Sequence, residues 1–113
     1  MKSDAFILRN ELLNDGCSIY LYFSRMYEEY VAYGYSAFVA LENCLPMEMS
    51  TDYSEEMQMP MVKVNPEQMA LIKSKGLIVE DGTDDGYLHI RSFILFDERK
   101  YSEWAGHLRE MNH

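Results

Sequence analysis

The tyrosine-rich stretch of residues 18–46 is the feature that most restricts how this chain can fold. It holds six of the nine tyrosines in the 113-residue sequence. Rings of this size need burial on at least one side, and their hydroxyls need polar partners or water. Residues 19–23 are an unbroken run of strand-favouring side chains, which is typical of a strand covered on both faces. We therefore expect this strand near the centre of the fold.

Residues 29–35 allow two interpretations. Tyr30, Val31 and Tyr33 favour a second strand, and Gly34 would weaken a helix interior by about 1 kcal/mol. The alternative is a single helix over residues 25–41, because aromatic and apolar residues there also recur at helical spacing: Met26, Tyr30, Tyr33, Ala37 and Leu41. The strand is the interpretation that we prefer.

A helix over residues 37–45 follows this predicted strand. The Ser36 hydroxyl is placed to accept a hydrogen bond from a backbone N–H of the first turn, so we predict that Ser36 is the N-cap. The helix would bury Phe38, Leu41 and Leu45, and Pro46 cannot continue it.

The N-terminal fifteen residues predict a helix that Ser3 or Asp4 caps and that Gly16 ends in the left-handed conformation. The apolar residues there form one stripe, which we expect to face the core: Ala5, Leu8 and Leu12, widened by Phe6 and Leu13.

The segment around residue 65 carries the clearest local signal in the chain. A short strand is expected over residues 60–64. Asn65 is a good N-cap, Pro66 suits the first helical position, and Gln68 is placed to complete a capping box. This helix should end at Gly76, and its apolar residues should be buried: Met69, Leu71 and Ile72.

The C-terminal part predicts a hairpin of strands 77–80 and 87–92 around an acidic turn, followed by a helix that Asp97 caps. One apolar face of that helix would close the core: Tyr101, Trp104, Leu108 and Met111. Residues 47–59 show no clear period and are expected to be a long acidic, Met-rich loop. Its methionines would fill gaps beneath the loop, or alternatively form an adaptable binding surface.

The predicted order is α-β-β-α-β-α-β-β-α. It indicates one domain over residues 1–113, of the α/β (α+β) class, with a single mixed sheet and helices packed on it. Nineteen acidic residues against ten basic ones give a formal net charge of −9, which on average repels phosphate backbones.

The sequence contains no motif of catalysis or cofactor binding. It has no Gly-rich phosphate loop and no nucleophile elbow. His89, His107 and His113 share no metal-ligand spacing with Cys17 or Cys44, and residues 81–86 lack the spacing of a calcium loop. We therefore expect no metal, no cofactor and no enzymatic activity. The absence of a leader or a membrane-spanning run predicts a cytoplasmic protein with both thiols reduced.

Several segments, in their order, resemble the N-terminal mismatch-recognition domain of MutS proteins. They are IYLYF at residues 19–23, EYVAYGYSA at 29–37, MPMV at 59–62, LIKSKG at 71–76 and IVE at 78–80. In that family the corresponding segments are a first strand, a Phe-Tyr-Glu strand with the helix start after it, a third strand, and a helix followed by a strand. The resemblance covers most of residues 1–92 and implies a related fold.

The site residues of that family are replaced here. The Phe that stacks on a mismatched base falls on Glu29, and the Glu that contacts the base falls on Val31. A second register places Met26-Tyr27-Glu28 on the motif and also lacks the stacking ring. Because a wedge needs an aromatic ring, the resemblance implies a fold and does not imply mismatch recognition.

We expect a small interaction domain whose partner is another protein or a second copy of the chain, with no membrane contact. Tyrosine is enriched at interfaces, so the candidate contacts are Tyr27, Tyr30, Tyr33 and Tyr35, although these rings could instead simply line a core. The alternative is a nucleic-acid-binding module that requires basic residues to converge on one face: Arg25, Lys63, Lys73, Lys75 and Arg91. A small enzyme is the third reading, and it would need a deep pocket with a desolvated Glu or His.

Overall fold

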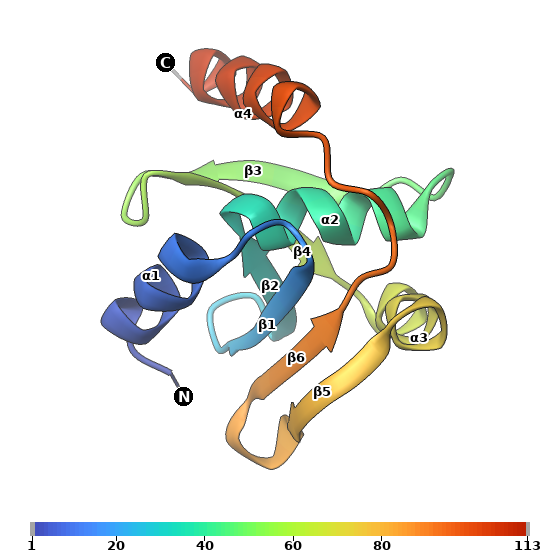
Figure 1. Ribbon diagram of the computed structural model, residues 1–113. Helices are drawn as coiled ribbons and strands as arrows, with labels where there is room; N and C mark the ends of the chain where they lie inside the picture. The colour runs from blue at the N-terminus through green and yellow to red at the C-terminus, as the bar shows by residue number, and fades with distance from the viewer. Residues whose placement is uncertain (1, 113) are drawn as a thin grey trace.

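Six antiparallel strands form one sheet in the computed structural model, which describes residues 2–112 (Figure 1). The strand order across the sheet is β3-β4-β2-β1-β6-β5. After the first helix, the order strand–strand–helix occurs three times along the chain. The elements are α1 (Asp4–Leu13), β1 (Ser18–Ser24), β2 (Glu29–Tyr33), α2 (Gly34–Cys44), β3 (Ser50–Ser54), β4 (Met59–Val64), α3 (Pro66–Lys75), β5 (Leu77–Gly82), the short 3-10 helix η1 (Thr83–Asp85), β6 (Tyr87–Arg91) and α4 (Glu98–Met111).

The β1–β2 hairpin lies at the centre of the sheet. Each outer hairpin joins it through its second strand, β4 beside β2 and β6 beside β1. The first strands of the outer hairpins, β3 and β5, therefore form the two edges. The predicted class, one sheet with helices packed on it, is confirmed, although every strand pairing is antiparallel rather than mixed.

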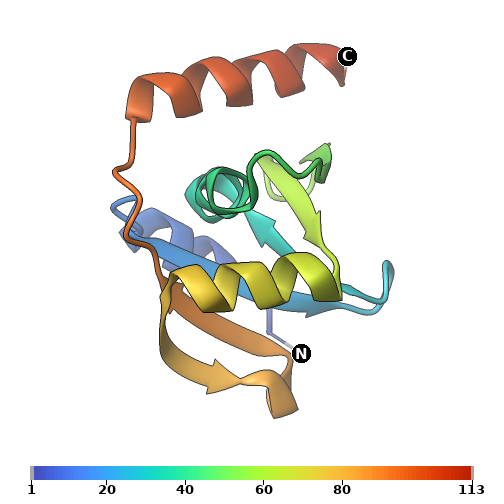
Figure 2. The same cartoon turned by 90° about the vertical axis from the view of Figure 1, so that its right-hand side faces the viewer.

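The sheet has an apolar core on each face. On one face, α2 and α3 cover a core that includes these buried residues: Ile19, Leu21, Ala32, Ala37, Val39, Ala40, Cys44, Val62, Val64, Ile72, Leu88 and Ile90. On the other face, α1 packs over a smaller cluster: Ile7, Tyr22, Val31, Met57, Met61 and Tyr87. Helix α4 lies on the outer side of α2 and β3 (Figure 2).

The choice between strand and helix after residue 29 is decided for the strand. Residues 29–33 form β2, and Tyr22 pairs with Val31 across the central hairpin.

Helix α2 begins at Gly34 rather than at residue 37, so the predicted N-cap is wrong. Ser36 lies inside the first turn and is fully buried, where its hydroxyl bonds to groups of other elements. Leu45 was expected in the core and is instead 53% exposed, and Leu41 is half-buried.

The predicted apolar stripe of α1 is also wrong. Leu12 and Leu13 are 85% and 72% exposed, and Leu8 lies near the surface. The inward side instead carries Phe6 and Ile7 at its start and polar residues further along: Asn10, Glu11 and Asn14. These three polar side chains bond to partners on β1 and α2, so hydrogen bonds orient this half of the helix.

The predicted loop of residues 47–59 contains the edge strand β3, which pairs with β4. Its sequence, STDYS, is polar and its first three residues are exposed, so it lacks the apolar alternation by which strands are recognised. The methionines of this segment do pack inward. Met57 and Met61 are buried, and Met47, Met49 and Met59 pack at the margins of the two cores.

The final helix closes the core only in part. Asp97 caps α4 as predicted, with its carboxylate accepting from the N–H groups of Arg99 and Lys100. Trp104 packs at the margin of the larger core, yet no residue of α4 is fully buried and Met111 is 70% exposed.

The capping box before α3 is confirmed. The Asn65 carboxamide accepts from the Gln68 N–H at 2.8 Å, and the Gln68 carboxamide accepts from the Asn65 N–H at 3.0 Å. Replacing Asn65 with Ala should lower the free energy of unfolding by about 1 kcal/mol, because a free N–H at the helix start loses its acceptor. Urea unfolding measures this change against Ser102→Ala on exposed α4. An Asn65→Ala effect no larger than that of the control would contradict the role of the cap.

Candidate functional site

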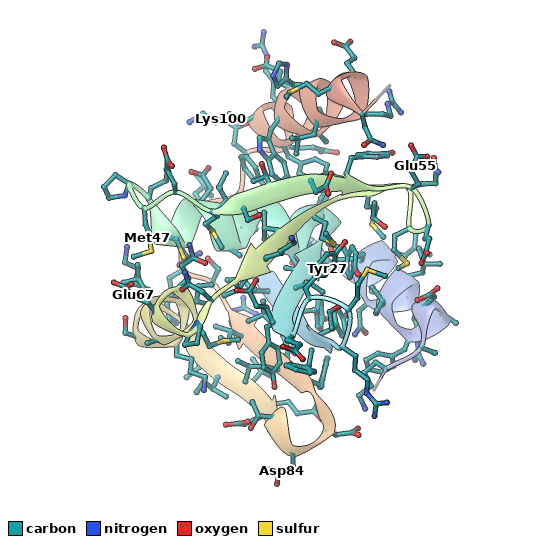
Figure 3. All side chains as sticks on the ribbon, turned by 180° about the vertical axis from the view of Figure 1, so that it is seen from behind. Tyr27, Met47, Glu55, Glu67, Asp84 and Lys100 are labelled. Carbon is teal, nitrogen blue, oxygen red and sulfur yellow. The ribbon has the colours of Figure 1, made fainter. Side chains whose placement is uncertain are left out.

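A trough of about 420 Å³ lies on the α1 side of the sheet and is the candidate functional site. Its floor is formed by side chains of the three central strands: Tyr22, Val31, Tyr33 and Met61. The start of α1, the β1–β2 turn and the end of β3 with its following turn form the walls. Figure 3 shows Tyr27 on the first of these turns and Glu55 on the second, with α1 beside them.

The two turns at the trough have the same construction. Each begins with a serine whose hydroxyl accepts a backbone N–H three residues later, Ser24 from Tyr27 and Ser54 from Met57. Each ends at a residue in the left-handed region, Glu28 and Gln58, both with φ of 55°. The residue that donates its N–H to the serine differs in environment between the two turns. The Met57 side chain is buried, whereas the Tyr27 ring is exposed.

The tyrosines of the trough are held by specific contacts. Asn10 on α1 donates to the Tyr22 hydroxyl at 3.0 Å, and the ring centroids of Tyr22 and Tyr33 are 6.4 Å apart. Burial raises the pKa of Tyr33, and the nearby acidic groups Asp4 and Glu56 raise it further. The Lys63 ammonium lies 4.1 Å from the centre of the Tyr27 ring, a cation–π contact that positions this ring at the mouth of the trough.

Acidic groups outnumber basic groups around the trough. Four carboxylates line it: Asp4, Asp52, Glu55 and Glu56. Two cations, Lys2 and Arg25, line it as well, and a third, Lys63, lies over the Tyr27 ring at its mouth. Lys2 already pairs with Asp85 at 2.8 Å. The balance at the trough therefore has the same sign as the net charge of the chain, and it favours a cationic ligand.

Two of the four predicted contact tyrosines reach this site. Tyr27 and Tyr33 line the trough, whereas Tyr30 points to the other face of the sheet. Tyr30 packs edge-on against Phe23, with ring centroids 5.6 Å apart. Tyr35 lies in the first turn of α2 and packs against other rings near α4, where its hydroxyl donates to Glu98. The structure therefore places Tyr30 and Tyr35 outside the trough.

The five basic residues of the nucleic-acid alternative do not gather in one patch: Arg25, Lys63, Lys73, Lys75 and Arg91. Lys63 and Arg91 face the α1 side, but the strand register places them at different positions along the sheet. Lys63 aligns with the middle of β2, whereas Arg91 pairs with the first residue of β1. Lys73 and Lys75 lie on α3, which covers the opposite face of the sheet.

We therefore expect no tight, sequence-independent binding of DNA by this chain. The scattered cations release few counterions, and a net charge of −9 repels the phosphate backbone. A fluorescence-anisotropy titration with matched and mismatched duplexes at low salt tests this expectation. Micromolar binding that weakens steeply with added salt would contradict it.

A second group of buried polar residues, which the sequence did not reveal, joins α1 to the start of α2. Ser36 donates to the Glu11 carboxylate through its hydroxyl at 2.5 Å and through its backbone N–H at 3.1 Å. The Ser36 hydroxyl in turn accepts from Asn14 at 3.1 Å and from the Tyr20 N–H at 2.9 Å. The only sequence signal for this network is that Glu11 and Asn14 lie on the same side of a helix.

Burial raises the pKa of Glu11 to about 7, while hydrogen bonds from Ser36 and Asn14 act in the opposite direction. Glu11 also lines a smaller pocket of about 250 Å³ beneath Leu8, Leu12 and Tyr101. A desolvated Glu in a pocket is the feature that an enzyme would need. Both carboxylate oxygens of Glu11, however, already accept hydrogen bonds from α2, so the group acts as a cap for that helix.

The remaining candidate residues show no further site. The His89 ring stacks on the Tyr20 ring, with centroids 4.3 Å apart, and hydrogen-bonds to the Ser18 hydroxyl. Burial lowers the pKa of His89. His113 lies outside the described residues. Within residues 2–112, no three His, Cys, Asp or Glu side chains are grouped to hold a metal ion. Cys44 is buried, and Cys17 is half-buried. In the same part of the chain, no helix has the length and apolarity needed to cross a membrane.

Comparison with known proteins gives no family for this chain. No family model, no curated protein and no solved structure matches it.

Proposed function

We propose that this protein is a non-enzymatic interaction domain that holds a basic segment of a partner protein in the trough on the α1 side of the sheet. The observation that carries the proposal is the combination of Tyr27 and Tyr33 with the carboxylates of Asp52, Glu55 and Glu56 around one concave surface. Lys and Arg side chains suit such a surface, because their alkyl stems pack on rings while their charged ends pair with carboxylates.

A peptide segment suits the trough better than a compact small molecule. The trough is an open groove between two hairpin turns and a helix, and its floor is aromatic and apolar. Tyrosine supplies contact area at a low cost in conformational entropy, and acidic rims attract cationic partners at long range. The proposal places the protein in the cytoplasm, where Cys17 and Cys44 remain reduced.

A pair of matched variants tests the proposal. The probe is a fluorescently labelled peptide rich in Lys, Arg and Leu, compared with a counterpart in which Glu replaces the basic residues. The double variant Asp52→Asn/Glu56→Gln should weaken binding of the basic peptide about tenfold, because two exposed ion pairs together contribute about 1–2 kcal/mol. The control Glu103→Gln/Glu110→Gln removes the same charge from exposed positions on α4 and should change the affinity little.

Equal loss of affinity in both double variants would contradict the proposal, because it would show only a general effect of net charge. Capture from native lysate, with and without nuclease treatment, then identifies the partner. The relevant proteins are those that the wild type and the α4 control retain and that the trough variant loses.

Two other functions are less well supported. A nucleic-acid-binding module of MutS-like descent would require its basic residues on one face, and they lie on different sides of the sheet. A small enzyme would require a free acid or base in a pocket. Among the described residues, the carboxyl whose pKa is strongly raised is that of Glu11, and the backbone and side chain of Ser36 already engage it.

A further inference from the structure

The β5 edge of the sheet exposes an apolar strand with no covering element. Leu77, Ile78 and Val79 are 55%, 42% and 54% exposed. Among the described residues, β5 pairs only with β6, and no other element lies on its outer side (Figures 1 and 2). An edge strand presents unpaired backbone N–H and C=O groups, which are a template for pairing with another strand.

The opposite edge of the sheet differs from β5 in both respects. Strand β3 has the polar sequence STDYS, and α4 packs beside it. Polar composition and a covering helix are common ways to protect an edge from pairing. Strand β5 has neither protection over its apolar residues, so the two edges are not equivalent.

The charges around β5 indicate which strand can pair with it. Lys73 and Lys75 precede the apolar residues, and Glu80 and Asp81 follow them. A second β5 in antiparallel orientation brings the basic last turn of α3 in one copy beside the acidic end of β5 in the other. A pairing centred on Ile78 would set Lys75 against Asp81 of the second copy.

We propose that two copies of this chain associate through their β5 strands, antiparallel and with two-fold symmetry. The paired strands cover the Leu77, Ile78 and Val79 side chains and extend the sheet across both copies. The two sets of opposite charges offset part of the repulsion between molecules of net charge −9. The pairing is short, because the bulge in β5 between Ile78 and Glu80 increases the twist of the strand.

Charge-swap variants test this dimer by sedimentation velocity from micromolar to near-millimolar protein. The wild type should show a concentration-dependent dimer. Lys75→Glu and Asp81→Lys should each weaken self-association at least about tenfold, because each places like charges side by side at the pairing. The double variant Lys75→Glu/Asp81→Lys, which has the net charge of the wild type, should restore the dimer. Lys75 and Asp81 are both exposed, and circular dichroism verifies the fold of each variant.

A control substitution on another exposed apolar residue completes the experiment. Leu95 is 92% exposed and lies outside β5, so Leu95→Lys should leave the dimer intact. A wild type that remains monomeric at near-millimolar concentration would overturn the proposal. It would also be overturned by a dimer that Leu95→Lys disrupts and the β5 variants do not, or by single variants that the charge swap fails to rescue.

Discussion

Replacing Gly16 with Ala should destabilise the protein by about 3 kcal/mol, from left-handed strain together with overpacking. Gly16 has φ of +93°, a conformation that costs an L-residue energy. A Cβ atom at this position would also lie 2.3 Å from Cγ of Phe96 and 2.7 Å from its Cβ. Phe96 packs at the margin of the larger core and against Tyr35, so it cannot move without loosening the attachment of α4.

Gly106 provides the matched control. It lies within α4, and a Cβ added there meets nothing within 4 Å. Gly106→Ala should raise the free energy of unfolding by about 0.5–1 kcal/mol, since Ala loses less backbone entropy than Gly in a helix. In urea unfolding, the free energy of unfolding should therefore fall for Gly16→Ala and rise for Gly106→Ala. A Gly16→Ala protein as stable as the wild type would contradict the packing of Phe96 over this turn.

Replacing Glu11 with Gln should remove a pH-dependent destabilisation of up to about 3 kcal/mol. The pKa of Glu11 is raised from 4.5 to about 7, so the folded state holds this proton more tightly than the unfolded state. Protonated Glu11 therefore stabilises the folded state. This contribution is fully present below about pH 4.5 and is lost as the pH rises through about 7. Gln stays neutral throughout, so the difference in stability between the two proteins should change over this window.

The measurement is the free energy of unfolding in urea at several pH values between about 4.5 and 8.5. Glu11→Gln should gain stability relative to the wild type as the pH rises, on top of a constant cost for the Ser36 hydroxyl that loses its acceptor. Glu110→Gln on exposed α4 serves as control and should track the wild type. A constant difference between Glu11→Gln and the wild type would contradict the burial of this carboxyl.

The elements that the sequence predicted well are those with strong local signals. The Asn65 capping box, the Asp97 cap and the left-handed Gly16 depend on interactions within a few residues, so the chain shows them directly. The central strands were recognisable because burial on both faces requires continuous apolar and aromatic residues. Strand β3 was not recognisable, because an exposed polar edge strand is defined by its pairing with β4 and not by its own composition.

The face of α1 shows why the site was predicted only in part. A search for apolar periodicity selects Leu8 and Leu12, but tertiary hydrogen bonds turn Glu11 and Asn14 inward. The tyrosines were expected to act together because they are close in sequence. Alternation along β2 instead sends Tyr30 and Tyr33 to opposite faces, and Tyr35 continues into α2. Which rings share a concave surface depends on strand register, which a single sequence does not specify.

The most direct test of the proposed interaction site is a titration of ¹⁵N-labelled protein with the basic peptide, followed by amide chemical shifts. We expect the largest shift changes around the trough, at Tyr27, Tyr33, Asp52 and Glu56, and little change along β5. The Glu-substituted peptide should leave the same signals unmoved. Shift changes concentrated outside the trough, or equal responses to the two peptides, would contradict the assignment of this surface as the binding site.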